Sequence, residues 1–320
     1  ESGQVFTPDH ITSLMYKILE VNANDKILDA ACGSGAFLVK SMSNMIKEVG
    51  GINTKEAKKI KEHSLFGIEF DREIFALACA NMMIHKDGKT NLEQLDSRDK
   101  EASEWIKSKG ITKVLMNPPF ERKYGCKKIV ENVLNSVPSG IKCAFIMPEK
   151  KMEKDKMGKL LEKHHLEAII KLPEKLFDAG VTTSIYVFET GKKQVGEIYG
   201  CYIEDDGLER VKNQGRQDIK DKWMELENYW VDSIRKRNDT KYGTSQWIDP
   251  KKFLSYQKPK AEFVLYEEDF VKTMMNYLMF KNKIDVKEFS DKLINKTLYN
   301  SEILKEDNNI VIKIKDAEDE

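Results

Sequence analysis

Over the first 190 residues, short apolar runs alternate with longer stretches in which apolar residues recur every three or four positions. The short runs are typical of buried strands, and the longer stretches are typical of amphipathic helices. Because strands that alternate with helices form parallel βαβ units, the pattern predicts an α/β fold with a doubly wound, mostly parallel, seven-stranded sheet. The predicted strands are residues 26–29, 65–69, 91–95, 111–116, 142–147, 168–172 and 184–189. No obvious helix joins the last two, so we expect them to form an antiparallel pair at the edge of the sheet.

Helices are predicted between these strands by the same spacing. Thr7 followed by Pro8 predicts a helix that begins with Thr7 as its N-cap and Pro8 at its first position. Further helices are predicted at residues 36–49, 54–63 and 71–85. The second of these three is rich in Lys and Glu, so we expect it to present a solvated face.

The pattern changes after Gly191. Shorter or more highly charged elements are predicted there: a strand pair at 198–203 with a turn at 205–207, a charged helix at 216–237, a helix at 266–280 and a strand at 310–314. Residues 239–261 show little periodicity, and the acidic tail at 316–320 is expected to fray. We therefore predict a catalytic domain over residues 1–195 and a smaller mixed or helical C-terminal extension over 196–320, available to contact DNA or a partner.

The charge balance restricts how the chain can bind nucleic acid. Its 320 residues include 53 Lys and Arg and 53 Asp and Glu, so the formal net charge is zero. DNA-binding domains often carry a basic excess. Any nucleic-acid surface must therefore come from local clustering of basic residues or from a partner.

Composition also bears on metals, membranes and location. The five cysteines form no Cys-x-x-Cys pair and the five histidines add no metal-ligand spacing, so we expect reduced thiols and no metal site. No apolar run approaches the roughly 20 residues of a membrane helix, and the start of the chain lacks a secretory pattern. We expect a cytoplasmic protein. Residue 1 is Glu and not Met, which is compatible with a fragment of a longer protein.

A glycine-containing loop follows the first predicted strand and opens the helix at 36–49. It runs from the strand end through two glycines into the helix, with Asp29, Ala31, Gly33, Gly35 and Phe37 as its candidate ligand-binding residues. The glycines allow a tight turn and a close approach of backbone to ligand. The third glycine of dinucleotide-binding loops is missing, and no Lys is placed to hold phosphate. A ligand without a diphosphate fits better, and S-adenosylmethionine is such a ligand.

Acidic residues end the next two predicted strands. Glu69 ends the second, where a carboxylate can accept hydrogen bonds from two ribose hydroxyls, since ligands of such sheets bind beyond the carboxyl ends of the strands. Asp71 is an alternative, although it is also suited to cap the following helix. Asp96 follows the third strand and can accept a hydrogen bond from an adenine amine or, alternatively, start a turn with Ser97.

The sequence Asn117-Pro118-Pro119-Phe120 ends the fourth predicted strand, at the same sheet edge as the glycine loop. An aromatic amine is a poor nucleophile because its lone pair is delocalised into the ring. The Asn117 side-chain oxygen and the Pro118 carbonyl can accept hydrogen bonds from such an amine and stabilise its developing positive charge. Pro119 stiffens the loop, and Phe120 offers a face on which a base can stack. The residues alone predict methylation of a planar amine.

Together these segments resemble the motif series of N6-adenine DNA methyltransferases, and in particular the modification subunits of type I restriction-modification systems and their single-chain relatives. The matching segments are residues 3–8, the loop at 29–37, Glu69, Asp96, residues 117–120, 172–177 and 183–185. The resemblance implies a Rossmann-like methyltransferase fold that binds S-adenosylmethionine. It covers about residues 1–190, and Ala30 stands where the family often has Pro.

The resemblance also implies residue roles. Phe6, Thr7 and Pro8 would line the methionine end of the cofactor, and the loop at 29–37 would hold its methionine moiety. Glu69 would bind the ribose and Asp96 the adenine. Asn117, Pro118 and Phe120 would hold a target adenine that has left the DNA duplex. Asn117 is also a candidate cofactor-binding residue.

Candidate partners follow from this order of motifs. Double-stranded DNA is the expected substrate, target recognition is expected from a specificity subunit or a C-terminal recognition domain, and a restriction nuclease is a further expected partner. Basic residues that follow the Asn-Pro-Pro-Phe motif are candidates for phosphate contacts, namely Arg122, Lys123, Lys127 and Lys128. The charged helix at 216–237 is either a DNA or partner surface or a solvated helix with an aromatic packing stripe.

Three alternatives remain open from the sequence. An Asn-Pro-Pro-aromatic motif also suits methyl transfer to an RNA base or to a glutamine amide of a protein. The chain is also compatible with a cofactor-binding subunit that mainly scaffolds a partner. Dehydrogenase function is disfavoured because the glycine loop lacks its third glycine.

Overall fold

The computed structural model describes residues 6–85, 91–120, 125–152, 154–174, 176–177, 181–212, 214–259, 265–299, 301–306 and 309–314. It contains two compact units, Glu1–Pro259 and Lys260–Glu320. Among the predicted functional residues, Arg122 and Lys123 lie outside the described residues, as do positions 3–5 of the first motif.

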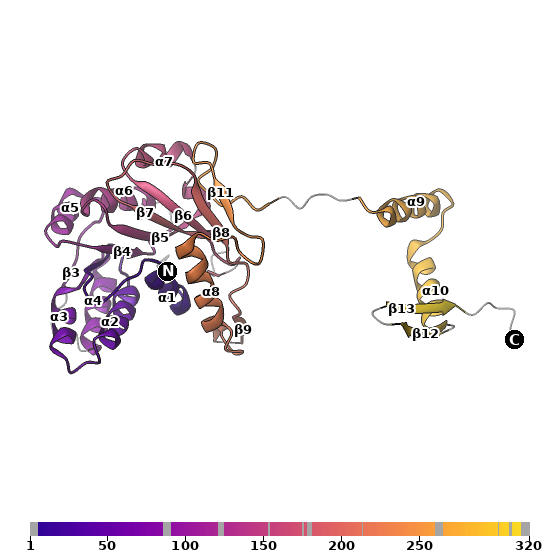
Figure 1. Cartoon of the computed structure of the whole chain (residues 1–320), viewed down its shortest axis with the longest axis horizontal. Helices are drawn as coiled ribbons and strands as arrows, with labels where there is room; N and C mark the ends of the chain where they lie inside the picture. The colour runs from indigo at the N-terminus through magenta and orange to yellow at the C-terminus, as the bar shows by residue number, and fades with distance from the viewer. Residues whose placement is uncertain are drawn as a thin grey trace. The chain divides into compact units, whose positions relative to one another are not determined.

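Within the described residues the first unit is built on a nine-stranded sheet, in the order β11-β8-β6-β7-β5-β4-β1-β2-β3 (Figure 1). Its strands are β1 (Ile27–Asp29), β2 (Leu65–Ile68), β3 (Asn91–Glu93), β4 (Lys113–Met116), β5 (Lys142–Pro148), β6 (His165–Lys171), β7 (Thr183–Glu189), β8 (Ile198–Tyr202) and β11 (Gln246–Ile248). Pairing is parallel between β1 and β2, β1 and β4, β2 and β3, β4 and β5, and β6 and β8. The mostly parallel α/β sheet predicted from the pattern is therefore confirmed.

Helices cover both faces of this sheet, as a doubly wound fold requires (Figure 1). They are α1 (Asp9–Ile18), α2 (Ala36–Glu48), α3 (Lys55–His63), α4 (Arg72–Ile84), α5 (Lys100–Lys107), α6 (Cys126–Ser136), α7 (Lys154–Leu161) and α8 (Trp223–Lys236). Neighbouring β5 residues enter different cores: Ala144 and Ile146 pack in the cluster that includes α1, α2 and α8 residues, whereas Phe145 packs in the cluster that includes α5 and α6 residues. The period of two along a strand thus builds two apolar layers.

The strands β6 and β7 are antiparallel, as expected, but the prediction that they form the sheet edge is wrong. β7 also pairs antiparallel with β5, and β6 continues the sheet through β8 to the edge strand β11. β8 is buried along its whole length, so it belongs inside a sheet. The strand pair expected at 198–203 is therefore not a pair, and the sheet has two more strands than predicted.

Several predicted boundaries move. Thr7 is not the N-cap of α1; Pro8 is, without a side-chain cap bond, and α1 starts at Asp9. In α3 the Thr54 side chain accepts a hydrogen bond from the Ala57 backbone, and Ala57 is buried, so this helix is not only a solvated face. The charged helix begins at Trp223; the residues before it form β10 (Gly215–Gln217), which pairs with β9 (Glu209–Val211). The helices α5, α6 and α7 were not predicted.

Since β8 and β11 join the main sheet, the first compact unit continues beyond the boundary expected after residue 195 and ends at Pro259. The second unit contains α9 (Glu267–Lys281), α10 (Val286–Tyr299) and a hairpin of β12 (Ser301–Glu306) and β13 (Asn309–Ile314). The predicted helix at 266–280 and the final strand are confirmed, whereas α10 and β12 were missed. Across the described residues, no helix has the length and apolar content to cross a membrane.

Candidate active site

A cavity of about 280 Å³ lies where β1, β2 and β4 end and where the chain leaves β3. The sheet order reverses between β1 and β4, which is where doubly wound sheets open a crevice for ligands. The cavity brings together residues from six segments of the chain. They are Phe6, Thr7, Asp29, Ala30, Ala31, Cys32, Gly33, Ser34, Ala36, Phe37, Glu69, Phe70, Asp71, Ile74, Asp96, Ser97, Arg98, Asn117, Pro118, Pro119 and Ile129.

The glycine loop turns from β1 into α2 through two residues with left-handed backbone. Gly33 has φ of 56° and Gly35 has φ of 86°, values that favour glycine over residues with a Cβ. Gly35 is the N-cap of α2 and its N–H donates to the Cys32 carbonyl over 2.8 Å. Gly33 reaches the cavity wall, whereas Gly35 shapes the turn without lining the cavity.

Glu69 connects the glycine loop to the end of β2. Its Oε2 accepts a hydrogen bond from the Gly33 N–H over 3.0 Å, and its Oε1 accepts from the Asp71 N–H over 2.9 Å. These two bonds hold the carboxylate in the cavity wall. Asp71 also lines the cavity, and its Oδ1 caps α4 by accepting from the backbone N–H groups of Glu73 and Ile74.

Asp29 is a buried carboxyl group at the end of β1. Its Oδ1 accepts a hydrogen bond from the Ala31 N–H over 3.1 Å. Burial raises the pKa of Asp29 to about 8; the Ala31 bond opposes this rise and the charge of Glu69 adds to it. A cation near Asp29 lowers this pKa, so the binding of a cationic ligand would favour loss of the Asp29 proton near neutral pH.

Asp96 lies in the cavity wall beside an arginine that the sequence analysis missed. The Asp96 carboxylate accepts from Arg98 Nε over 2.7 Å and from Arg98 Nη2 over 2.5 Å. The Arg98 bond holds the pKa of Asp96 below its usual range, against the opposing effect of burial. Arg98 also lies over the Phe70 ring, 5.9 Å from its centre. The backbone bond from Arg98 N–H to Asp96 Oδ1 forms the turn considered as an alternative role, so Asp96 both forms the turn and lines the cavity.

The Asn-Pro-Pro-Phe motif leaves β4 at the cavity. The Asn117 side-chain amide donates a hydrogen bond to the Thr7 hydroxyl over 2.9 Å, and Pro118 and Pro119 line the wall. Phe120 packs edge-on against Phe177, with ring centres 5.5 Å apart. Phe177 belongs to the predicted motif at 172–177, so the two motifs meet. Of the predicted catalytic and cofactor-binding residues, Pro8, Gly35 and Phe120 do not line the cavity.

The lining has a distinct charge character. Three carboxylates, from Glu69, Asp71 and Asp96, face this cavity together with the Asp29 carboxyl group, and the cation that the structure describes in its wall is Arg98, which is paired with Asp96. Phe70 and two isoleucines add apolar surface. Such a cavity suits a cationic ligand with an apolar portion and disfavours a phosphate.

The basic residues considered for DNA contact differ in their surroundings. Lys127 and Lys128 are exposed in the first turn of α6. Two lysines near α8 form ion pairs with acidic residues of the protein: Lys220 with Glu209, and Lys236 with Asp232. Trp223 and Trp230 are buried, so the packing interpretation of this helix is confirmed.

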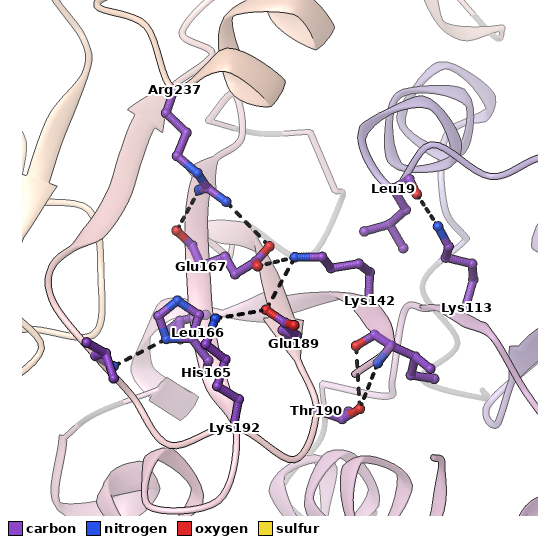
Figure 2. Close-up of polar contacts among 12 residues, drawn as sticks. Leu19, Lys113, Lys142, His165, Leu166, Glu167, Glu189, Thr190, Lys192 and Arg237 are labelled. Carbon is purple, nitrogen blue, oxygen red and sulfur yellow. Dashed lines mark hydrogen bonds and ion pairs between the residues drawn. The ribbon is translucent and has the colours of Figure 1, made fainter. Parts of the chain in front are cut away.

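Arg237, at the end of α8, joins an ion-pair network with strand residues of the sheet (Figure 2). It donates to the Glu167 backbone carbonyl over 2.9 Å and pairs with the Glu167 carboxylate over 3.4 Å. Lys142 bridges Glu167 and Glu189. Lys142 begins β5, Glu167 lies early in β6 and Glu189 ends the antiparallel β7. The network therefore lies at the strand ends opposite the cavity.

Comparison with known proteins agrees with this geometry. The chain belongs to the N-6 DNA methylase family, whose model matches residues 1–142 and 134–241. It is 30% identical over 305 residues to the type II restriction enzyme and methyltransferase RM.BcgI of Heyndrickxia coagulans, an alignment that covers 87% of this chain and 46% of the relative. The chain spans about half the length of the curated relatives that it matches.

The fold is shared with solved methyltransferase structures. A modification subunit of a putative type I restriction enzyme from Vibrio vulnificus YJ016 superposes with a TM-score of 0.62 at 19% identity, covering 81% of this chain and 58% of that one. A putative class I S-adenosylmethionine-dependent methyltransferase from Listeria monocytogenes gives a TM-score of 0.53 at 17% identity, with 73% and 72% covered. The fold is therefore the Rossmann-like methyltransferase fold that the sequence predicted.

Proposed function

We propose that this chain carries the catalytic site of an S-adenosylmethionine-dependent DNA methyltransferase that modifies N6 of an adenine flipped out of double-stranded DNA, within a restriction-modification or related defence system. One observation carries the proposal: Asn117, Pro118 and Pro119 line the same cavity as the glycine loop and Glu69. The group suited to hold a planar amine thus faces the groups suited to hold the methyl donor. Since the substrate is cellular or invading DNA, the proposed place of action is the cytoplasm.

The cavity suits S-adenosylmethionine by the charge of its wall and by its position at the ends of β1, β2 and β4. Residues from β1, β2 and the loop after β3 would hold it. The Gly33 backbone and the Asp29 carboxyl group would bind its methionine end. Glu69 would bind its ribose, and Asp96 would bind its adenine amine. Phe6 and Thr7 would cover the methionine end, while Phe70 and Arg98, which sequence reasoning did not include, would border the adenine. When bound, the cofactor supplies a methyl group on a sulfonium sulfur, and the positive charge matches the acidic wall.

The residues of the Asn-Pro-Pro-Phe motif would orient the target amine. The Asn117 amide nitrogen donates to the Thr7 hydroxyl, and the amide oxygen lies in the same plane on the opposite side of the amide carbon. That oxygen and the Pro118 carbonyl would accept the two hydrogens of N6 and aim its lone pair at the methyl carbon. In the proposed reaction a bond forms between the methyl carbon and N6, and the bond between that carbon and sulfur breaks, which leaves its electron pair on sulfur. N6 loses one proton to solvent.

DNA binding and sequence recognition are proposed to need more than the described residues. Removing a base from the duplex costs a few kcal/mol, and the chain has no net positive charge to offset this. We propose that Lys127 and Lys128 contact the DNA backbone and that a specificity subunit or recognition domain selects the sequence. The relative named as both restriction enzyme and methyltransferase supports a link to a nuclease.

The RNA and protein-glutamine alternatives use the same chemistry at a different amine, so the test must include these substrates. Purified protein, with candidate specificity subunits where required, would be incubated with labelled S-adenosylmethionine and duplex DNA, RNA or protein. The proposal predicts label in DNA as N6-methyladenine. Asn117→Ala should abolish the label while cofactor affinity stays within about twofold, since Asn117 acts on the amine.

A matched control is Asn135→Ala, because Asn135 contacts His164 and is not part of the cavity wall. This variant should methylate DNA at the wild-type rate. Methylation by Asn117→Ala at the wild-type rate would refute the proposed site, and label in RNA or protein in place of DNA would refute the proposed substrate.

A further inference from the structure

The segment that covers one side of the cavity continues directly into α1. Phe6 and Thr7 line the cavity, and the next residue, Pro8, caps the helix. The Pro8 carbonyl accepts hydrogen bonds from the backbone N–H groups of Ile11 over 3.0 Å and Thr12 over 3.1 Å. The placement of Thr7 is therefore tied to the placement of the first turn of α1.

That first turn is held by a residue from the second half of the chain. His10 Nε2 lies 3.0 Å from Oδ2 of Asp206, which is 196 positions away and fully buried. Asp206 follows β8, in the loop before β9. A buried carboxylate is costly unless it is paired, so Asp206 and His10 constrain each other's position.

The remaining contacts of Asp206 fix it in place. Its Oδ1 accepts from the Leu208 N–H over 3.1 Å and pairs with the Arg216 guanidinium of β10. Burial raises the pKa of Asp206, but the His10 bond, the Leu208 bond and the Arg216 charge outweigh it and leave the pKa below its usual range. The Trp223 ring meets the His10 ring edge-on, with centres 4.9 Å apart. His10 is thus held from two sides.

The other end of α1 is held by α8, which lies against α1 (Figure 1). Lys17 forms an ion pair with Glu227, and Glu227 also accepts from Trp223 Nε1 over 3.1 Å. Arg235 donates to the Lys17 carbonyl over 3.0 Å. The His10 contact lies three residues from Thr7, whereas the Lys17 contacts lie ten residues away. Asp9, two residues from Thr7, pairs with Lys40, but its carboxylate is exposed, so the buried His10–Asp206 contact is the stronger constraint on the end of α1 next to the cavity.

We propose that Asp206 is a positioning residue for the cavity: through His10 it fixes the start of α1, and so holds Phe6 and Thr7 over the proposed cofactor site and Thr7 against Asn117. This assignment rests on the proposed function for its consequence in cofactor binding, but its structural part stands apart from it. It also gives residues 198–217 a role in the site.

The experiment compares three variants with the wild type. Asp206→Asn removes the charge that His10 contacts, His10→Ala removes the contact from the other side, and His10→Gln keeps a polar group near the position of Nε2. Hydrogen exchange of the backbone amides of residues 6–18 is measured without cofactor, and the dissociation constant for S-adenosylmethionine is measured by calorimetry. Asp206→Asn and His10→Ala should each raise exchange in this segment and weaken cofactor binding by about tenfold, the scale of one lost hydrogen bond to a charged group. His10→Gln should restore most of both.

A matched control is Glu167→Gln, because Glu167 is a nearly buried carboxylate that pairs with Lys142 and Arg237 at the opposite strand ends (Figure 2). It should lower the unfolding temperature without changing exchange at residues 6–18 or cofactor affinity. If Asp206→Asn and His10→Ala also leave both unchanged, the proposal is overturned. If Asp206→Asn does not fold, the two His10 variants decide. If the wild type binds no S-adenosylmethionine, the proposed function fails, while the exchange measurement still decides the positioning role.

Discussion

The side-chain amide of Asn117 donates a hydrogen bond to the hydroxyl of Thr7, over 2.9 Å and across 110 positions of the chain. This bond joins the segment before α1 to the motif that ends β4. The two segments lie on the wall of one cavity. Any change that moves Thr7 is therefore expected to change the orientation of the Asn117 amide.

The first prediction concerns a substitution that removes this hydrogen bond. Thr7→Val keeps the shape of the side chain but loses the hydroxyl, so the Asn117 amide loses its acceptor. We expect the single-turnover rate of DNA methylation to fall about tenfold, the scale of one hydrogen bond in positioning a reacting group. Thr7→Ser, which keeps the hydroxyl, should stay close to the wild type. Equal rates for the valine and serine variants would show that the bond does not orient Asn117.

The second prediction concerns Glu69, which accepts hydrogen bonds from Gly33 and Asp71. Glu69→Ala leaves the Gly33 N–H without this acceptor and removes the proposed ribose ligand. Calorimetry should show S-adenosylmethionine bound about 10- to 100-fold more weakly, as expected for hydrogen bonds to a charged group. Glu73→Ala is the control, because Glu73 is exposed in the first turn of α4. Cofactor binding by Glu69→Ala at wild-type strength would place the ribose elsewhere.

The third prediction follows from the raised pKa of Asp29. The group keeps its proton up to about pH 8 in the folded protein, whereas its usual pKa is 3.8. Between these values the unfolded chain binds fewer protons than the folded one, so a rise in pH favours unfolding. Relative to Asp29→Asn, the wild type should lose free energy of unfolding from pH 5 to pH 8 and level off above.

Urea unfolding at several pH values measures this difference. Saturating S-adenosylmethionine should flatten the slope, because a cation in the cavity favours the ionised carboxylate. A difference between wild type and Asp29→Asn that does not vary with pH would mean that Asp29 titrates at its usual pKa.

The sequence predicted the lining of the cavity better than the sheet around it. Gly33, Glu69 and Asn117 each follow a parallel strand, and such strand ends meet at one sheet edge, so their meeting in the cavity followed from local pattern. Arg98 was missed because its role depends on reaching back to Asp96 and over Phe70. No spacing rule encodes that contact.

The errors in the predicted strand order and helices have a similar physical origin. β8 pairs with β6 and with β11, strands separated from it along the chain, and strand order depends on such long-range pairing. α5 was missed because its eight residues bury only Ala102 and Ile106, which is too little apolar periodicity to detect. The contact of His10 with Asp206 spans 196 positions and was likewise outside the reach of local pattern.

The fourth prediction tests the proposed DNA surface. Lys127 and Lys128 are exposed in the first turn of α6. If both contact phosphates, the double change to Ala should weaken DNA binding for all sequences and reduce the slope of log affinity against log salt by roughly 2. Binding would be followed by fluorescence anisotropy at several salt concentrations. Changing Lys58 and Lys59, which are exposed on α3, should leave the slope unchanged.

If the double variant keeps the wild-type slope, these lysines do not meet the DNA backbone, and the phosphate contacts must come from elsewhere, such as a specificity partner.

The proposal that this chain methylates adenine N6 through Asn117 is tested most directly by sequencing that maps N6-methyladenine in genomic DNA. The cells compared carry the wild-type protein, Asn117→Ala or no copy of the gene. We expect a specific motif to be methylated at adenine N6 in the wild type and unmethylated in both other strains. An identical methylation map in all three strains, with the purified wild-type protein transferring methyl groups to RNA or to a protein, would contradict it.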